Sequence, residues 1–311
     1  MPAQTTSTIL MVRPANFGFN PETAENNFYQ KQDDRDSGEI NQIAQKEFDG
    51  FVTLLESKGI AVIVIEDSDD PKKTDSIFPN NWFSTHADGK VILYPMFSPN
   101  RRLERRKDII EKLMELGFKI EEVIDLSFFE QDDQYLEGTG SLILDRENKI
   151  AYACRSLRTH AVPLQYLGRL IDYEIVDFDA TQTINGEISP IYHTNVMMHV
   201  GSEIAIVCLE SISNTSERLN LQSKLELSGK KIIPITAKQK FNFAGNMLEV
   251  QNQKGEKFTV MSKAAFDALS KAQKENILKH TEIISPEIPT IEKLGGGSAR
   301  CMMAEIFLPK G

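Results

Sequence analysis

The chain has 311 residues, of which 41% are hydrophobic and 26% are charged, a profile typical of a globular protein rather than a fibrous or disordered one. Its 45 acidic residues outnumber 35 basic ones, and a net charge of -10 would repel a phosphate backbone, so we expect no nucleic-acid partner. Because no run approaches about 18 apolar residues and the first residues lack the features of a secretory signal, we expect a cytoplasmic protein with no membrane partner.

The N-terminal part of the chain predicts two strands joined by a helix. Residues 8–12 form a short apolar run that is typical of a strand. Apolar residues then recur at helical spacing from Ile40 to Leu55, and Gly59 is placed to end that helix. The apolar run from Ile60 to Ile65 follows directly and predicts a buried strand.

Four further copies of one pattern follow, each with two strands joined by a turn, then a helix and a third strand. The ranges expected for strand, strand, helix and strand are 83–86, 91–94, 109–114 and 118–123 in the second copy; 141–144, 150–154, 163–170 and 173–178 in the third; 196–200, 204–208, 216–227 and 231–235 in the fourth; and 247–250, 258–261, 262–280 and 282–284 in the fifth. The last apolar run, 301–308, can pair with residues 8–12 and complete the first copy.

One residue stands just before the first strand of each copy, and these residues recur with a near-constant period. They are separated by 56, 56, 53 and 55 residues and are Asn81, Glu137, His193, Asn246 and Cys301. Such a period indicates a repeat architecture. Although the length alone suggests two domains, we therefore expect residues 1–311 to form a single α/β domain of five ββαβ units around a pseudo-fivefold axis. The five positions would then meet near the axis.

The three cysteines have different surroundings. They include no C-x-x-C pair, which argues against a disulfide framework or a structural zinc site. Cys154 and Cys208 end apolar strands in successive copies, which indicates a structural pair. Cys301 follows the glycine run 295–297, whose backbone can approach a ligand closely. We interpret Cys301 as a candidate nucleophile, although a cysteine at the start of a strand is commonly a small buried hydrophobe.

The residues expected at the axis form a reactive set. A thiol needs a base or a positive neighbour to become a thiolate, a histidine transfers protons, and a carboxylate orients and stabilises the imidazolium. Cys301, His193 and Glu137 are the residue types for these three roles. We expect no metal and no cofactor, because His193 and His199 lie about 20 Å apart along an extended strand at ~3.3 Å per residue and cannot share one ion.

Two other patterns are assigned structural roles. The glycine run 295–297 is not followed by Lys and Ser or Thr, so it does not form a phosphate-binding loop. The basic run from Arg101 to Lys107 is interpreted as a solvated helix start, with an anion contact as the alternative.

Five motifs together resemble the pentein superfamily of guanidine-modifying enzymes, and in particular the arginine deiminase-related group that contains the citrulline utilization hydrolase type and the amidinotransferases. The motifs are Phe78-Pro79-Asn80-Asn81-Trp82, Leu136-Glu137-Gly138-Thr139-Gly140, Ser156-Leu157-Arg158-Thr159, Tyr192-His193-Thr194-Asn195-Val196 and Gly295-Gly296-Gly297-Ser298-Ala299-Arg300-Cys301-Met302.

This resemblance implies a five-bladed α/β propeller with a Cys-His-acid site at its axis. It implies that Cys301 attacks the central carbon of a guanidinium or ureido group, that His193 transfers protons, and that Glu137 holds His193. Substrate contacts are expected from Arg158, which would bind a carboxylate in bidentate geometry, and from a wider set of residues: Arg13, Asp75, Asn80, Asn81, Asn195, Asn246 and Gly297.

The chain departs from arginine deiminases at Asn81 and Asn195, where those enzymes carry aspartates. Two carboxylates complement a guanidinium cation, whereas an amide offers a donor and an acceptor, which suits a neutral ureido group. A citrulline-like substrate is therefore favoured. Two features oppose this preference: succinylarginine dihydrolase, by resemblance, carries an asparagine at the first position, and Asp75 could restore a charge.

Our interpretation is a cofactor-free cysteine hydrolase acting on a C–N bond of a small arginine-derived molecule. Amidino transfer to an amine is one alternative, and a non-catalytic binding protein on the same fold is another. The particular substrate, the presence of a lid and the oligomeric state, a homo-oligomer included, stay open.

Overall fold

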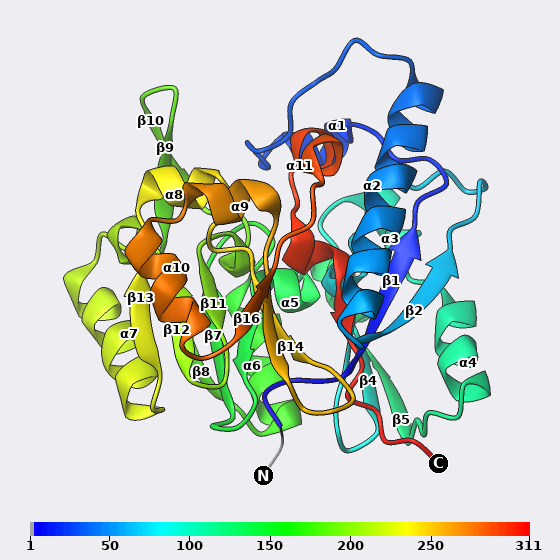
Figure 1. The fold of residues 1–311 in the computed structure, drawn as a ribbon. Helices are drawn as coiled ribbons and strands as arrows, with labels where there is room; N and C mark the ends of the chain where they lie inside the picture. The colour runs from blue at the N-terminus through cyan, green and yellow to red at the C-terminus, as the bar shows by residue number, and fades with distance from the viewer. Residues whose placement is uncertain (1–2) are drawn as a thin grey trace.

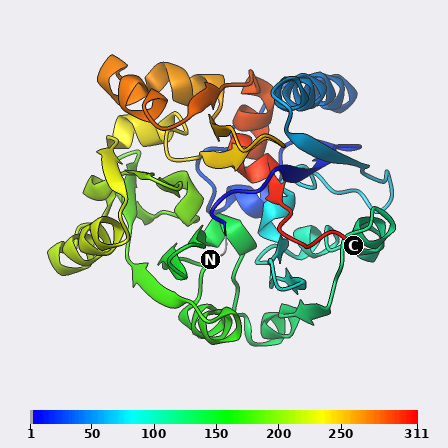
Figure 2. The same cartoon turned by 60° about the horizontal axis from the view of Figure 1, so that its bottom comes forward.

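The computed structural model describes residues 3–311, which form five three-stranded sheets around a common axis with helices on the outside (Figures 1 and 2). In every sheet the middle strand pairs antiparallel with one neighbour and parallel with the other. The sheets are β17 (Ala304–Glu305), β1 (Thr8–Arg13) and β2 (Ala61–Glu66); β3 (Phe83–Thr85), β4 (Lys90–Leu93) and β5 (Glu122–Asp125); β6 (Ile143–Asp145), β7 (Ile150–Cys154) and β8 (Glu174–Phe178); β11 (Met198–Val200), β12 (Ile204–Val207) and β13 (Lys231–Pro234); and β14 (Leu248–Gln251), β15 (Lys257–Val260) and β16 (Glu282–Ile284). This is the expected five-bladed α/β propeller of ββαβ units.

Helices connect the parallel strands of each unit across the outside of the ring. They are α2 (Ser37–Ser57), α4 (Lys107–Glu115), α6 (Ala161–Ile171), α7 (Thr215–Leu227) and the pair α9 (Lys263–Ala268) and α10 (Lys271–Leu278). In α2 the carboxylate of Asp36 accepts hydrogen bonds from the first backbone N–H groups, and Gly59 follows the helix with a φ of 78°. The apolar residues predicted at helical spacing, such as Phe48 and Leu55, are buried against the sheet.

Pairing between the two ends of the chain completes the first unit. Ile9 of β1 lies opposite Glu305 of β17 in an antiparallel register. The strand is shorter than the predicted run 301–308, because Cys301 lies in a single 3-10 turn, η5 (Ala299–Met302), before β17 begins.

Short helical turns also precede the first strand in three other units. They are η1 (Pro79–Asn81), α5 (Gly138–Ser141) and η3 (Thr194–Val196). The strands predicted to begin at residues 141 and 196 therefore begin two residues later, at Ile143 and Met198, whereas the strand predicted to begin at Phe83 does so. The turn α5 packs against both η1 and η3, so the backbones at Asn81, Glu137 and His193 lie close together.

The helix predicted for residues 262–280 is divided in two. Leu269 adopts an extended conformation, and the side chain of Ser270 begins α10 by accepting a hydrogen bond from the backbone N–H of Gln273. Gln273 in turn reaches back to the backbone of Ser270, which completes a capping box. The single long helix was thus a wrong prediction.

A hairpin of β9 (Thr181–Ile184) and β10 (Glu187–Pro190) was not predicted and projects from the body of the molecule (Figure 1). Its turn residues Asn185 and Gly186 both have positive φ, 51° and 86°, as a two-residue hairpin turn requires. The remaining short elements are α1 (Pro21–Ala24), α3 (Pro99–Arg102), η2 (Ser127–Asp132), η4 (Leu209–Ser211), α8 (Ala237–Phe241) and α11 (Pro289–Gly295). Within residues 3–311, no helix combines the length and apolar character needed to cross a membrane.

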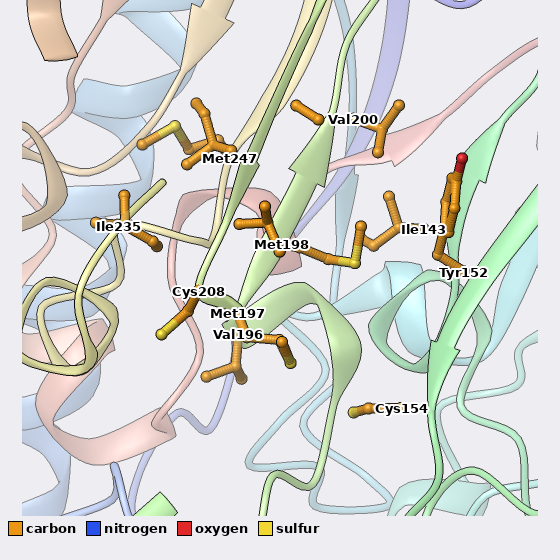
Figure 3. Packing of buried hydrophobic residues seen from close by; sticks show 14 of the residues in the cluster. Ile143, Tyr152, Cys154, Val196, Met197, Met198, Val200, Cys208, Ile235 and Met247 are labelled. Atoms are coloured by element: carbon orange, nitrogen blue, oxygen red, sulfur yellow. The ribbon is translucent and has the colours of Figure 1, made fainter. Parts of the chain in front are cut away.

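Apolar side chains fill the spaces between sheets and outer helices, and the two cysteines assigned structural roles lie there (Figure 3). Cys154 and Cys208 are fully buried in the cluster that also contains Met197 and Met198. Burial raises the pKa of the Cys154 thiol to about 11. A thiol in this environment stays protonated and serves as a packing group.

Candidate active site

The turns before the first strands surround a small buried cavity of about 10 Å³, room for roughly one water molecule. Residues from four of the five units and from the N-terminal segment line it: Thr23, Asn27, Asp75, Phe78, Asn81, Arg101, Arg158, Tyr192, His193, Gly295, Gly297 and Cys301. The structure thus brings together Cys301, His193 and Asn81, which are up to 220 positions apart in the chain.

His193 and Glu137 form a hydrogen-bonded pair beside the cavity. The imidazole Nε2–H donates to Glu137 Oε2 at 2.8 Å, so Nδ1 carries the free lone pair. Burial lowers the pKa of His193 to about 4 despite the neighbouring carboxylate. Burial alone would raise the pKa of Glu137, but Arg158, His193 and Arg101 hold it well below its usual value. The pair therefore combines a neutral imidazole base with an ionised carboxylate that orients it.

Cys301 is almost fully buried and faces amide donors. The side-chain nitrogens of Asn195 and Asn246 each donate to its sulfur at 3.3 Å. The backbone N–H of Arg300 donates to Asn246 Oδ1, which fixes the orientation of that amide. Two N–H groups aimed at the sulfur can stabilise negative charge on it, in contrast to the apolar surroundings of Cys154.

Arg158 lines the cavity and is 1% exposed, and each of its three nitrogens donates at least one hydrogen bond within the chain. It donates to Glu137 Oε2 at 3.4 Å and to the carbonyl oxygen of Thr23 at 3.0 Å. Its Nε donates to Asn26 Oδ1 at 2.8 Å, and the ring of Tyr192 lies under the guanidinium carbon at 5.0 Å. The oxygens of Asn26 and Thr23 thus accept from N–H groups of Arg158 that were expected to bind a substrate carboxylate.

Arg101 is part of the site, which corrects the prediction that the basic run 101–107 is a solvated helix start. It is 3% exposed and forms a bidentate pair with Glu104, with N···O distances of 2.9 and 2.8 Å. It also donates to Asn81 Oδ1 at 2.9 Å and lies 3.7 Å from Asp75. Glu104 lies just beyond α3 (Pro99–Arg102) and is buried with Arg101, whereas Lys107 at the end of the run is exposed, so the prediction was wrong for Arg101 in particular.

Asp75 lies in the cavity wall, and its carboxylate Oδ2 accepts from the side chains of Asn20 and Thr23 at 2.8 and 3.2 Å. Its second oxygen is buried and finds no hydrogen-bond partner among residues 3–311. Burial raises the pKa of Asp75, opposed by the positive charge of Arg101. Burial likewise raises the pKa of Glu104 to about 7.

Asn81 and Asn195 each keep one buried polar atom that lacks a partner within the described chain. Arg101 can only donate, so Asn81 must present Oδ1 to it and its free atom is the donor Nδ2. Asn195 directs Nδ2 to the sulfur, which leaves Oδ1 as a free acceptor. Asn195 contacts Cys301 but does not line the cavity, and Asn81 Nδ2 lies against Gly140, where an added Cβ would be 2.4 Å away. Buried polar groups of this kind normally find partners.

Other expected substrate contacts lie in different places. Asn80 donates its amide to Thr139 Oγ1 at 3.3 Å and joins η1 to α5 outside the cavity lining. Gly297 does line the cavity, and a Cβ there would lie 2.8 Å from the ring of Phe78. Arg13 lies outside the lining and forms a bidentate pair with Asp49 at 2.7 and 2.9 Å, so the structure does not bring it to the site.

The N-terminal segment covers the cavity, a feature not predicted from the sequence. Thr23 and Asn27 line it directly. Asn27 and Gln30 donate side-chain hydrogen bonds to the carbonyl oxygen of Gly295, at 3.3 and 3.0 Å. No periodic pattern marks this polar segment, although its asparagines and threonines are residue types that bind backbone and side-chain groups locally.

Gly140 allows the close approach of two site residues, and its replacement is expected to impair the site. A Cβ at this position would lie 2.4 Å from Asn81 Nδ2 and 2.8 Å from His193 Nδ1. We expect Gly140→Ala to displace both side chains and to lower kcat/KM about 100-fold, since a shift near 1 Å has effects of that size. Circular dichroism and steady-state kinetics check this, with Gly50→Ala in α2, where an added Cβ would meet no atom within 4 Å, as a control for loss of a glycine. Kinetics like those of the unsubstituted protein for Gly140→Ala would contradict the assigned geometry.

The five-bladed α/β propeller, with cysteine, histidine and glutamate from three units at its axis, defines the protein as a pentein. The sequence profile of the family described as N,N dimethylarginine dimethylhydrolase, eukaryotic, matches residues 13–308, and the chain belongs to this dimethylarginine dimethylaminohydrolase type of family. A search of curated protein sequences finds no significant match.

Solved structures share the fold. The N-terminal domain of ArgZ bound to substrate, an arginine dihydrolase from the ornithine-ammonia cycle in cyanobacteria, is 17% identical with a TM-score of 0.70, and the match covers 97% of this chain and 99% of that one. Unliganded AgrE is 19% identical with a TM-score of 0.71, with coverage of 98% and 40%. An adduct of dimethylarginine dimethylaminohydrolase with S-methyl-L-thiocitrulline is 13% identical with a TM-score of 0.65, with coverage of 96% and 99%. The chain therefore spans 40% of the longer ArgZ and AgrE chains.

Proposed function

We propose that residues 1–311 form one catalytic domain that hydrolyses a C–N bond of a guanidino or ureido group in a small arginine-derived molecule. The observation that carries the proposal is the arrangement at the axis, where Cys301 accepts two amide hydrogen bonds and a neutral His193 is held by the ionised Glu137. Family membership supports the substrate class, and the names of the similar structures refer to arginine and its derivatives.

The site suits nucleophilic catalysis through a covalent intermediate. Cys301 gives its thiol proton to His193 Nδ1, and its sulfur bonds to the central carbon of the substrate. The same proton then passes to the departing ammonia or amine as the C–N bond breaks, which leaves a thiouronium from a guanidino group or a thiocarbamate from a ureido group. Water attacks this carbon, gives a proton to His193, and releases the product as the sulfur leaves and regains the proton.

The unpaired amide atoms of Asn81 and Asn195 support a ureido group as the preferred reacting group, as in citrulline. The free donor Asn81 Nδ2 complements a ureido oxygen, which gains negative charge when the sulfur attacks. The free acceptor Asn195 Oδ1 complements a ureido N–H. A guanidinium offers only donors and would leave Asn81 Nδ2 unsatisfied, while Arg101 and Arg158 already pair with Glu137. On the basis of this preference we propose a function like that of the citrulline utilization hydrolase type.

Replacement of Asn81 by aspartate is expected to reverse this preference. The aspartate would still accept from Arg101, but its second oxygen would replace the free donor with an acceptor. We expect the ratio of kcat/KM for citrulline to that for arginine to fall at least about tenfold, the effect of one hydrogen bond worth ~1.4 kcal/mol. Competition assays with both compounds measure the ratio, and Asn276→Asp on the surface of α10 adds the same charge elsewhere as a control. An unchanged ratio in Asn81→Asp would show that Asn81 does not select the substrate.

Turnover of a panel of compounds tests the proposal directly. The purified protein is incubated with citrulline, arginine, N,N-dimethylarginine, agmatine and N-succinylarginine, and ammonia or amine release is measured. A parallel assay with added glycine detects amidino transfer, in which an amine replaces water. Hydrolysis of at least one compound is the expected result. Failure to consume any compound, with no covalent labelling of Cys301, would favour a binding protein on the same fold.

A further inference from the structure

The glycine loop that precedes Cys301 is held from several sides. Tyr192 donates its hydroxyl hydrogen to the carbonyl oxygen of Gly296 at 2.8 Å, beside the contacts that Asn27 and Gln30 make with the loop. The side chain of Ser298 donates to Glu292 Oε1 at 2.6 Å. The carbonyl oxygen of Ser298 accepts from the backbone N–H of Cys301 at 2.9 Å. Ser298 therefore links Glu292 directly to the backbone of the nucleophile.

Glu292 is a buried carboxyl group with no basic partner in the described part of the chain. It lies in α11 and is 7% exposed. It accepts a hydrogen bond from the hydroxyl of Ser298, and the hydroxyl of Ser262 lies nearby. The charged neighbour is Glu47 on α2, which accepts from the first backbone N–H groups of α11 and is itself near Arg35. The mechanism proposed above makes no use of Glu292. Burial of a carboxylate without a paired cation costs free energy.

We propose that Glu292 is a positioning residue that holds the glycine loop, and with it Cys301, through Ser298, and that ionisation of Glu292 tightens this hold. A hydroxyl donates more strongly to a carboxylate than to a neutral acid. Burial raises the pKa of Glu292 to about 7, while the two serine hydroxyls oppose the shift. Its charge state therefore changes near neutral pH.

Two opposite trends follow from this assignment. Because the folded-state pKa lies above the ordinary value of 4.5, the folded protein binds the proton more tightly, and stability is lost as pH rises through about 7. Over the same range the hold on Ser298 strengthens and Cys301 becomes better placed. A residue with only a structural role would not make reactivity rise while stability falls.

The experiment compares the unsubstituted protein with Glu292→Gln, which keeps the hydrogen-bond acceptor without the titration. The rate of Cys301 alkylation by iodoacetamide is measured by peptide mass spectrometry from pH 5.5 to 8.5, with thermal unfolding alongside. The ratio of the two alkylation rates cancels the titration of the thiol. We expect the alkylation rate of the unsubstituted protein, divided by that of Glu292→Gln, to rise about threefold to tenfold as the pH passes through 7, consistent with the gain from one charge-assisted bond. Over the same range, the unfolding temperature of the unsubstituted protein should fall relative to that of Glu292→Gln. Glu287→Gln, a neighbouring exposed carboxylate, serves as the control and should show neither trend.

Ser298→Ala provides a second test, which does not require a Glu292 variant to fold. Its alkylation rate should fall by a similar factor at pH 8.5, and adding Glu292→Gln should cause no further fall, because both changes remove the same link. A flat ratio across pH, or additive losses in the double variant, would overturn the assignment. The inference rests on the proposed function only in treating Cys301 as the residue that turns over substrate. If alkylation follows the predicted ratio but no compound is turned over, the proposed function is refuted and the positioning role is not.

Discussion

Cys301→Ala is expected to abolish turnover of every guanidino or ureido compound that the protein consumes. In the proposed mechanism the thiol forms the bond to the central carbon, and among residues 3–311 Cys301 is the one thiol in the cavity lining. We expect a loss of at least about 10⁴-fold in kcat, as when the nucleophile of a catalytic triad is removed. The fold should be retained, because alanine fits the space of the small side chain. Ammonia release under saturating substrate measures the effect.

Cys154→Ala and Cys208→Ala provide matched controls for this substitution. Both cysteines are fully buried in an apolar cluster outside the cavity lining, so their replacement removes packing and leaves the chemistry in place. Their kcat should stay within about twofold, with a modest loss of stability. Equal losses of kcat in all three variants would contradict the assignment of Cys301 as the nucleophile.

Glu137→Gln is expected to damage both catalysis and stability. The carboxylate holds His193 and lies between Arg158 and Arg101, with N···O distances of 3.4 and 3.9 Å. Its neutral replacement leaves two buried guanidinium groups without this counter-charge, which costs about 3–5 kcal/mol when a buried pair is broken. The imidazolium formed during the reaction also loses its partner, so kcat should fall roughly 10²–10⁴-fold. Urea unfolding and steady-state kinetics measure the two effects.

Glu130→Gln is the corresponding control for the loss of a paired carboxylate. Glu130 binds Arg105 and Arg102 outside the cavity lining, with 11% of its side chain exposed. Its replacement should lower stability and leave kcat unchanged. If Glu137→Gln behaved like Glu130→Gln, Glu137 would not be the residue that orients His193.

The sequence was sufficient to predict the repeat and the positions that meet at its axis. A period of 53 to 56 residues requires equivalent residues to occupy equivalent places in the ring. The hydrogen bond from His193 to Glu137 and the contact of Asn246 with Cys301 join positions predicted on this basis alone. Helix boundaries marked by apolar periodicity and a following glycine, as in α2, were likewise close to those observed.

Two errors concern signals that the sequence contains. Asn185-Gly186 between alternating residues is typical of a two-residue hairpin turn, and the structure has this hairpin in a segment for which no strand is predicted. Ser270 followed by Gln273 matches a capping box and marks the start of α10 inside the region predicted as one helix. Both patterns span only a few residues, whereas the predicted elements depend on longer periodic segments.

The contributions of Arg101 and the N-terminal segment could not be predicted, for a different reason. Arg101 belongs to a charged run that resembles a solvent-exposed helix, and only tertiary contacts with Asn81, Asp75 and Glu104 make its burial favourable. The polar segment around Thr23 shows no periodicity, and its role depends on side chains from three other units. Such sites are assembled by the fold as a whole, which local propensity does not describe.

The central claim is that Cys301 becomes covalently bonded to the carbon of a guanidino or ureido group. Rapid acid quenching during turnover of citrulline or arginine, followed by peptide mass spectrometry, tests it most directly. We predict a thiocarbamate or thiouronium adduct on the peptide that contains Cys301, absent in Cys301→Ala, with Cys154 and Cys208 unmodified. Turnover with no adduct on Cys301, or an adduct on either of the other cysteines, would contradict the account.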